Sequence, residues 1–226
     1  MTVRLPTSDK RTSVIGSTGS GKTQFAVWLL STRDFDVRPW VIFDFKGDAL
    51  IEQLGATEID VAGKPPVNPG LYIVRPLPGD EAAVSLFLQR CWAQENIGIY
   101  IDEGYMLPKL DRWFRACLTQ GRSKHIEMII LSQRPVWMDR YVFTEANFFA
   151  VFRLNSLEDR KHMRNFVEDR PEGEKKRGQE PKRLPDYHCL WYDVDRQQAN
   201  VLSPVPDADT LISIFKKRLE KRPVKI

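Results

Sequence analysis

The chain has 226 residues, 42% of them hydrophobic and 28% charged, with 34 Lys and Arg against 30 Asp and Glu. At roughly 100–200 residues per domain this length predicts one domain with a sizeable core, and the composition excludes a disordered protein. No stretch reaches the ~18 consecutive apolar residues of a membrane span, and the first ten residues lack the apolar run of a signal peptide. We therefore expect neither a leader nor a transmembrane segment.

The spacing of the cysteines and the distribution of charge further restrict the class of protein. Cys91, Cys117 and Cys189 lie far apart without a C-x-x-C pair, which excludes a disulfide framework and a zinc knuckle and predicts reduced thiols. The basic excess is C-terminal, because residues 160–226 hold 16 Lys and Arg against 11 Asp and Glu. A bias of this size is compatible with a polyanionic partner but is weak evidence for one.

Short apolar runs rich in β-branched residues alternate with longer segments of helical periodicity. The expected strands are 13–15, 40–43, 71–74, 97–101, 127–131, 148–152 and 188–192. The expected helices are 23–30, 81–92, 111–120 and one that begins at about residue 207. Near-continuous apolar strands between helices predict an α/β fold, in which a doubly wound, mainly parallel sheet is flanked by helices.

We interpret residues 1–226 as a single domain, with a core from about 11 to 170 followed by a charged loop, a strand and a C-terminal basic helix in 171–226. The loop contains Lys175-Lys176-Arg177 and Lys182-Arg183, but acidic residues intersperse them, which favours a solvated loop over a DNA-binding patch. For Lys216-Lys217-Arg218 of the last helix, contact with DNA, a membrane, a capsid protein or a neighbouring subunit stays open. Packing of that helix's apolar face on the core is the preferred interpretation.

A phosphate-binding motif lies near the N-terminus. Its residues are Gly16, Ser17, Thr18, Gly19, Ser20, Gly21, Lys22 and Thr23. They match G-x-x-x-x-G-K-[ST] between an expected strand and an expected helix, which is the context that this motif requires. Glycines let backbone N–H groups surround the phosphates, and the helix N-terminus favours their negative charge. We expect Lys22 to contact the β- and γ-phosphates and Thr23 to bind Mg²⁺.

Polar residues follow two later strands. Asp102 and Glu103 end the strand 97–101, where Asp102 can hold the water shell of Mg²⁺ and Glu103 can polarise the attacking water. The alternative is a strand end that caps the next helix, but Asp followed directly by Glu favours a motor-type ATPase. Gln133 follows the strand 127–131 and can sense the γ-phosphate at the same sheet edge. Its alternative is a polar turn that Pro135 ends.

Four segments together resemble the HerA/FtsK superfamily of DNA-pumping ATPases. They are Phe43–Asp48, Asp102-Glu103, Gln120–Lys124 and Leu131–Pro135. With 145–147 and 152–160, the resemblance covers about residues 11–170, and its most specific parts are the Gln-Arg-Pro turn and the Gly-Arg segment. It implies a RecA-like P-loop NTPase fold.

The resemblance also implies a homo-oligomeric ring, usually a hexamer, with ATP between subunits and double-stranded DNA in the channel. DNA held by its phosphates would be bound without sequence preference. A trans-acting arginine would complete each site by stabilising charge on the transferred phosphoryl group. Arg122, in its Gly-Arg setting, is the first candidate and Arg153 the second; either is alternatively a surface or channel arginine.

The chain lacks the added domains of the larger members and is nearly a bare motor. In this it resembles the genome-packaging ATPases of membrane-containing, double-jelly-roll viruses. That likeness implies packaging of linear viral DNA into a preformed capsid, with capsid or membrane proteins at a packaging vertex as partners, and a location in the host cytoplasm and the virion.

Two alternatives stay open. One is a cellular motor of the same superfamily in conjugation, plasmid transfer or DNA end processing. The other is a non-motor protein, either a nucleotide-dependent assembly factor or a small-molecule kinase, which would not require Glu103.

Overall fold

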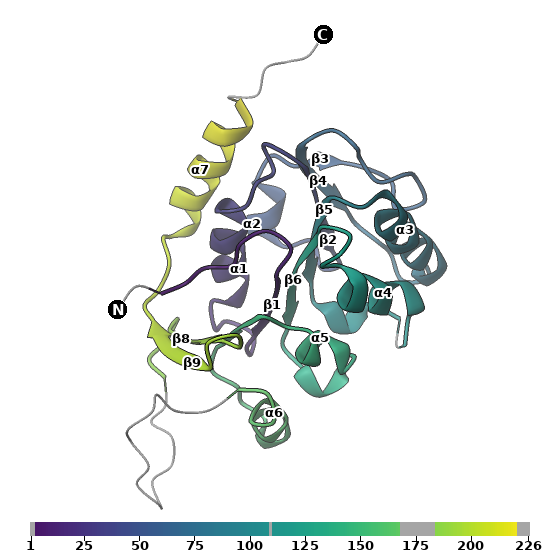
Figure 1. Ribbon diagram of the computed structural model, residues 1–226. Coiled ribbons are helices and arrows are strands. Elements are labelled where there is room, and N and C mark those ends of the chain that lie inside the picture. Colours follow the sequence, from purple (N-terminus) through teal and green to yellow (C-terminus); the bar gives the residue numbers. More distant parts are fainter. Residues whose placement is uncertain (1–2, 109, 168–183, 221–226) are drawn as a thin grey trace, which may run out of the picture.

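The computed structural model describes residues 3–108, 110–167 and 184–220 and places helices on both faces of a central sheet (Figure 1). Within these residues the sheet has nine strands in the order β3-β4-β2-β5-β6-β1-β7-β8-β9. The strands are β1 (Arg11–Ile15), β2 (Pro39–Asp44), β3 (Thr57–Glu58), β4 (Gly70–Val74), β5 (Ile97–Asp102), β6 (Ile126–Ser132), β7 (Phe148–Val151), β8 (Cys189–Asp193) and β9 (Gln198–Leu202). Strands β1 to β7 pair in parallel, whereas β8 and β9 add an antiparallel edge. The expected mainly parallel α/β fold is confirmed.

Helices α1, α2 and α7 lie on one face of the sheet, and α3, α4 and α5 lie on the other (Figure 1). The helices are α1 (Lys22–Ser31), α2 (Ala49–Glu52), α3 (Glu81–Gln94), α4 (Arg112–Gln120), α5 (Tyr141–Thr144), α6 (Leu157–Met163) and α7 (Ala208–Glu220), with 3-10 turns η1 (Gly104–Met106) and η2 (Pro135–Trp137). The seven expected strands and four expected helices are all present. The analysis of periodicity missed β3, β9, α2, α5 and α6, which are short or lie at the sheet edge, where burial does not impose a clear apolar pattern.

Large aromatic side chains fill the core between the sheet and α1. Trp40 of β2 is fully buried and lies directly against Gly98 of the paired strand β5. A Cβ atom at residue 98 would lie 2.0 Å from the Trp40 ring, so this pair requires glycine in an otherwise apolar strand. On the outer strands, Phe148 stacks on Trp191 with ring centroids 5.2 Å apart, which joins the antiparallel edge to the parallel sheet.

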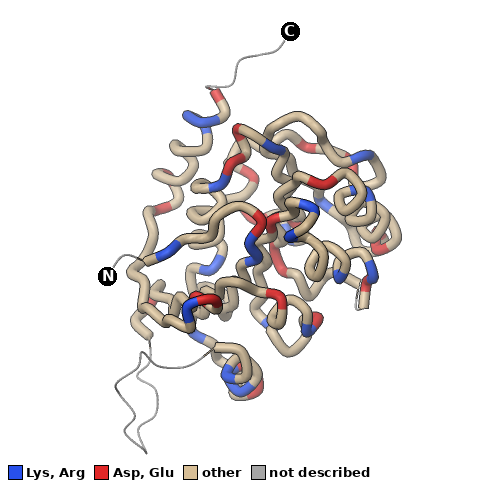
Figure 2. Tube along the Cα trace, in the orientation of Figure 1, with Lys and Arg blue, Asp and Glu red and all other residues tan. Residues whose placement is uncertain are grey.

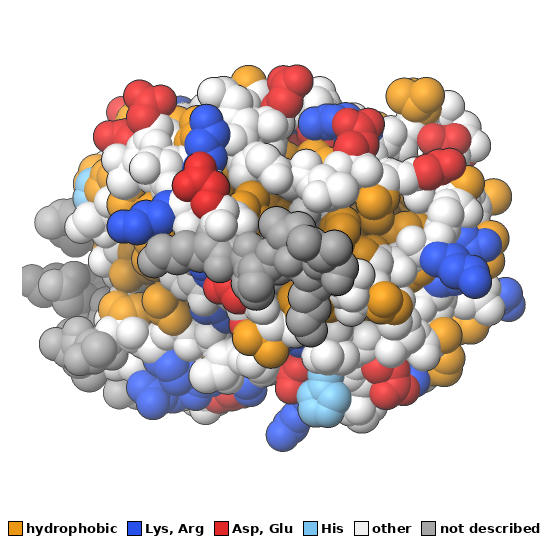
Figure 3. All heavy atoms as spheres, turned by 90° about the horizontal axis from the view of Figure 1, so that it is seen from above, with side chains coloured by type: hydrophobic (Ala, Val, Ile, Leu, Met, Phe, Trp, Pro, Cys, Tyr) orange, Lys and Arg blue, Asp and Glu red, His pale blue; other side chains and the backbone are white. Residues whose placement is uncertain are grey.

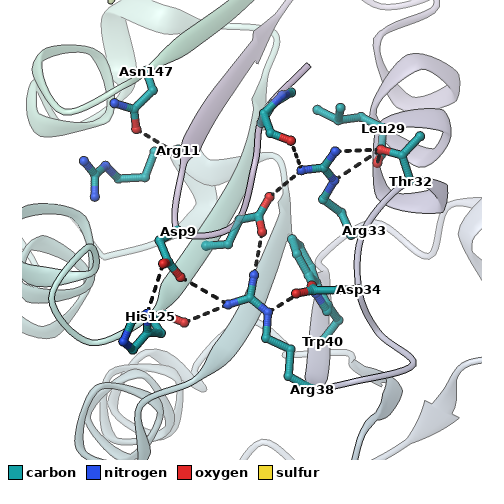
Figure 4. Close-up of polar contacts among 12 residues, drawn as sticks. Asp9, Arg11, Leu29, Thr32, Arg33, Asp34, Arg38, Trp40, His125 and Asn147 are labelled. Carbon is teal, nitrogen blue, oxygen red and sulfur yellow. Dashed lines mark hydrogen bonds and ion pairs between the residues drawn. The ribbon is translucent and has the colours of Figure 1, made fainter. Parts of the chain in front are cut away.

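A buried ionic network holds the edge of the sheet at which the parallel strands begin. Arg33 and Arg38 approach Glu127 of β6 at 2.9 and 2.6 Å, and all three side chains are less than 10% exposed. Figure 4 shows the two guanidinium groups converging from the end of α1 and the start of β2, with Asp9 and His125 beside them. Because each charge has a partner, the network links three distant segments without leaving a charge buried alone.

Helix α7 runs along α1 (Figure 1), and Arg218, one of two basic residues in its last turn, packs against the core. The Arg218 guanidinium lies 3.8 Å from the centre of the Phe35 ring and donates to the carbonyls of Ser31 and Arg33. Leu211 and Phe215 are fully buried. The preferred interpretation of α7 as a helix packed on the core is confirmed, and Arg218 contributes to that packing.

Positive and negative side chains alternate over much of the molecule. In Figure 2 blue and red segments are interspersed among the elements, and the face in Figure 3, opposite the P-loop, shows both signs. Lys175-Lys176-Arg177, Lys182-Arg183 and Lys221-Arg222 lie outside the described residues. Among the residues that the structure does describe, no helix is both long and apolar enough to span a membrane.

Candidate active site

The segment predicted to bind phosphate, residues 16–23, runs from the end of β1 into the first turn of α1, as expected. The N–H of Gly16 donates to the Ser132 carbonyl at 3.1 Å, and the N–H of Ser17 donates to the Arg153 carbonyl at 3.0 Å. These two hydrogen bonds join the loop to the end of β6 on one side and to the segment after β7 on the other. The loop therefore sits at the carboxyl ends of three adjacent parallel strands, where α/β proteins bind ligands.

Gly21 shapes the entry into α1. Its φ of 94° is left-handed, and a side chain there would meet the Tyr187 ring, whose nearest carbon lies 3.1 Å from an ideal Cβ position. No described side chain caps α1 at this point. The first N–H groups of the helix thus remain available for an anion, as phosphate binding requires.

Glu103 lies at the centre of the site and is fully buried. Its Oε1 atom is 3.0 Å from Lys22 Nζ, and its Oε2 atom accepts a hydrogen bond from the Gln133 N–H at 3.2 Å. Its backbone is left-handed, with φ 59°, a conformation that costs about 1–3 kcal/mol for a residue other than glycine and persists only where contacts hold it. The side chain does not cap η1, which argues against the interpretation of this acid as a helix cap.

Asp102, the residue predicted to hold the water shell of Mg²⁺, is buried beside Glu103 at the end of β5. Burial and the neighbouring Glu103 charge raise the pKa of Asp102 to about 7. Its Oδ1 atom is buried and has no hydrogen-bond partner in the described structure. An unpartnered carboxylate oxygen next to the P-loop fits Mg²⁺, which prefers oxygen ligands and retains several waters.

Lys46 contributes a contact that sequence analysis did not assign. Its Nζ atom contacts Oε1 of Glu103, the atom that Lys22 also approaches. Lys46 is placed by the turn after β2, where Asp44 Oδ1 accepts from the N–H groups of Gly47 and Asp48. The parallel pairing of Asp44 with Asp102 brings the two strand ends together. The sequence indicated only that Lys46 follows a predicted strand. The order of the strands was needed to show that this strand lies next to β5 and that Lys46 reaches Glu103.

Gln133 bridges the P-loop and the segment after β5. Its Oε1 accepts from Thr18 Oγ1 at 2.5 Å, and its Nε2 donates to the Tyr105 hydroxyl at 2.9 Å. The Gln133 side chain therefore touches the tip of the loop at which the γ-phosphate is expected. Arg134 turns away, with its Nε 3.3 Å from Asp159 Oδ2 and its guanidinium over Trp137.

The two candidate arginines lie at opposite edges of the sheet. Arg122 is exposed in the turn between α4 and β6, at the end of β6 remote from the P-loop. The first and last of the seven residues of β6 are about 20 Å apart, six steps of ~3.3 Å. Burial lowers the pKa of Arg11 at the start of β1; the charge of Glu145 raises this pKa in part, and the nearby charge of Arg122 lowers it. Arg153 instead lies beside its own P-loop and pairs with Asp186 at 3.2 Å. Only Arg122 is separated from the site of its own chain.

Fold and site together define a P-loop ATPase: a P-loop motif follows β1, a buried carboxylate pair lies at the end of β5, and Gln133 directly follows β6. Comparison with known proteins makes this class more specific. The chain is 44% identical over 221 residues to the DNA packaging ATPase P9 of Enterobacteria phage PRD1, covering 95% of this chain and 96% of that protein. The chain therefore belongs to the family of this phage packaging ATPase. No family model matches.

Solved structures agree on the fold. The genome packaging NTPase B204 of Sulfolobus turreted icosahedral virus 2, in complex with sulfate, superposes with a TM-score of 0.66 at 16% identity, covering 89% of this chain and 100% of that one. Its AMPPCP complex gives 0.63 at 16% identity, covering 87% and 98%. EssC ATPases 2 and 3 of Geobacillus thermodenitrificans give 0.63 at 14% identity, covering 95% and 45%. The expected likeness to viral genome-packaging ATPases is confirmed.

Proposed function

We propose that this chain hydrolyses ATP to drive double-stranded DNA into a preformed viral capsid. Membership in the PRD1 packaging ATPase family favours a viral motor over the cellular translocases of conjugation, plasmid transfer or DNA end processing. The observation that carries the hydrolytic step is the placement of Glu103, buried and oriented by Lys22 and the Gln133 N–H at the P-loop. A kinase or a nucleotide switch has no need for such a carboxylate.

In this proposal, each group of site residues has a separate role in ATP hydrolysis. P-loop N–H groups and Lys22 hold the β- and γ-phosphates, and Thr23 and Asp102 hold Mg²⁺, Asp102 through water. When bound, Mg²⁺ neutralises charge on the phosphate oxygens. Glu103 accepts the proton of the water that attacks the γ-phosphorus, the bond to the ADP oxygen breaks, and ADP and phosphate leave. Gln133 reports the presence of the γ-phosphate through its contact with Thr18.

A ring explains the position of Arg122. In a homo-oligomer, most simply a hexamer, Arg122 of one subunit would reach the γ-phosphate of the next, whereas Arg153 would act within its own subunit. DNA in the central channel would be held by its phosphates without sequence preference. Residues 1–226 would function as one ATPase domain that docks on capsid or membrane proteins at a packaging vertex, in the host cytoplasm and then in the virion.

The test is steady-state ATP hydrolysis by the purified chain with and without linear double-stranded DNA. We expect DNA to stimulate hydrolysis, and Glu103→Gln to abolish it while ATP binding is retained, because the amide cannot take the proton. Lys22→Ala is the matched control and should lose binding. Equal loss of ATP binding in both variants would contradict the role assigned to Glu103.

A further inference from the structure

A cavity adjoins the P-loop on the side away from Glu103. It has a volume of about 170 Å³ and opens to solvent beside the first turn of α1. It is lined by Gly21, Gln24, Phe25, Tyr187, Pro204 and Val205. Four of these side chains are apolar or aromatic, as is usual for a site that binds an organic ring.

The order of the strands determines which part of a nucleotide can reach this cavity. The groups that act on the γ-phosphate, Glu103 and Gln133, follow β5 and β6, which lie to one side of β1. Tyr187 precedes β8 and Pro204 follows β9, and both strands lie to the other side of β1. A nucleotide whose γ-phosphate points toward β5 must extend in the opposite direction from the P-loop. Its base is the part that arrives at the cavity.

Tyr187 is placed to receive that base. Its ring packs against the P-loop at Gly21, yet 59% of the residue remains exposed. Aromatic side chains with an accessible face stack on bases of any sequence. Resting on the proposed ATPase function, we propose that this cavity is the site of the nucleotide base and that Tyr187 is its stacking partner.

Two contacts hold the walls of the cavity in place. Gln24 Nε2 donates to the Pro206 carbonyl at 2.7 Å, which ties α1 to the segment before α7. Asp186, next to Tyr187, pairs with Arg153, whose carbonyl in turn accepts from the P-loop N–H of Ser17. The cavity is therefore connected to both sides of the phosphate site, so that base and phosphates can be bound in one rigid arrangement.

The experiment separates base binding from phosphate binding in the full chain. Calorimetry should give Tyr187→Ala a Kd for ADP about tenfold weaker than the wild-type value, the loss expected for one base stack. Inorganic tripolyphosphate, which has no base, should bind both proteins equally. Tyr187→Phe should bind ADP like the wild type, because the ring is kept. Tyr141→Ala, which removes an exposed tyrosine on the other face of the sheet, is the matched control and should change neither Kd.

An unchanged Kd for ADP in Tyr187→Ala would overturn the inference. So would an equal loss of tripolyphosphate binding, because Tyr187 would then act only by shaping the P-loop. Failure of the wild-type chain to bind ADP at all would instead contradict the proposed function.

Discussion

Among single residues, the two buried carboxylates of the site differ in that Glu103 contacts two lysines whereas Asp102 Oδ1 has no partner in the described structure. Asp102 and Glu103 are adjacent and buried, and the cations in contact with them, Lys22 and Lys46, both approach Glu103. Asp102 has neither an ion pair nor a hydrogen bond at Oδ1 in the described structure. A buried carboxylate without a partner lowers the stability of the fold, and in the proposed function Mg²⁺ would supply that partner.

The loss of stability caused by the Asp102 charge can be measured by comparing the free energy of unfolding of the wild type and of Asp102→Asn at different pH values. The pKa of Asp102 is about 7 in the folded chain, against about 4 in an unfolded chain, so ionisation favours unfolding. The penalty is absent below about pH 4, grows as the pH rises and is complete above about pH 7. Without nucleotide at pH 8, Asp102→Asn should therefore raise the free energy of unfolding by about 1–3 kcal/mol while abolishing Mg²⁺-dependent hydrolysis.

Urea unfolding at pH 5 and pH 8 checks this expectation. The gain from Asp102→Asn should be larger at pH 8 than at pH 5. Asp60→Asn alters an exposed carboxylate and should show no such difference. A loss of stability in Asp102→Asn at pH 8 would contradict the assignment of Asp102 as a buried charge that lacks a partner.

At the scale of elements, ionic contacts fix how the first helix meets the sheet. Arg33 follows α1 and Arg38 precedes β2, and both bind Glu127 of β6 (Figure 4). Since Gln133 directly follows the other end of β6, the network positions one strand of the candidate active site from the opposite edge of the sheet. Glu127 is the one charged residue in a strand that is otherwise apolar up to Ser132.

Glu127→Ala should be strongly destabilising, because it leaves two buried guanidinium groups without their shared carboxylate. Removing one partner of a buried ion pair costs about 3–5 kcal/mol. Glu58→Ala removes the partner of Arg75 at a position where Glu58 is 65% exposed, and should cost less than about 1 kcal/mol. Urea unfolding should show a lower midpoint for Glu127→Ala alone, with an unchanged slope. Similar losses in both variants would contradict the structural role of the network.

At the scale of the whole molecule, the nucleotide site faces one edge of the sheet and Arg122 the other. A single chain cannot bring Arg122 to its own P-loop without crossing the length of β6. If subunits assemble with the Arg122 edge of one against the P-loop edge of the next, each site receives an arginine that its own chain cannot supply. Contact between subunits and hydrolysis would then be coupled.

Mixing two inactive variants tests this coupling. Arg122→Ala should abolish hydrolysis with nucleotide affinity near normal, and Lys22→Ala should abolish binding. In mixed assemblies, some intact P-loops of Arg122→Ala chains would meet the intact Arg122 of Lys22→Ala chains, so part of the ATPase activity should return. Arg153→Ala mixed with Lys22→Ala is the control and should not recover, because Arg153 lies beside its own P-loop. No recovery at any ratio of Arg122→Ala to Lys22→Ala would contradict the assignment in trans.

Much of this architecture was predictable because it rests on local patterns. The alternation of buried strands and helices, and the P-loop between β1 and α1, follow from periodicity and from a motif whose residues are contiguous. Strands β3 and β9 escaped prediction because two residues, or a half-exposed edge, carry too weak an apolar pattern. The antiparallel orientation of β8 and β9 was also not predicted. It depends on which edge of the sheet is free to pair with further strands, and local patterns do not contain that information.

Local patterns in the sequence therefore predicted the class of fold, the P-loop and the two carboxylates at the end of β5. Which side chains meet at the site depends on the tertiary fold, because the order of strands in this sheet differs from their order in the chain. That order brings Lys46 onto Glu103 and Thr18 onto Gln133, places Arg153 beside its own loop, and leaves Arg122 at the far edge. It also sets Tyr187, more than 160 residues from Gly21 in the chain, against the glycine that begins α1. Contacts of such sequence separation depend on the packing of the whole sheet, which no local pattern encodes.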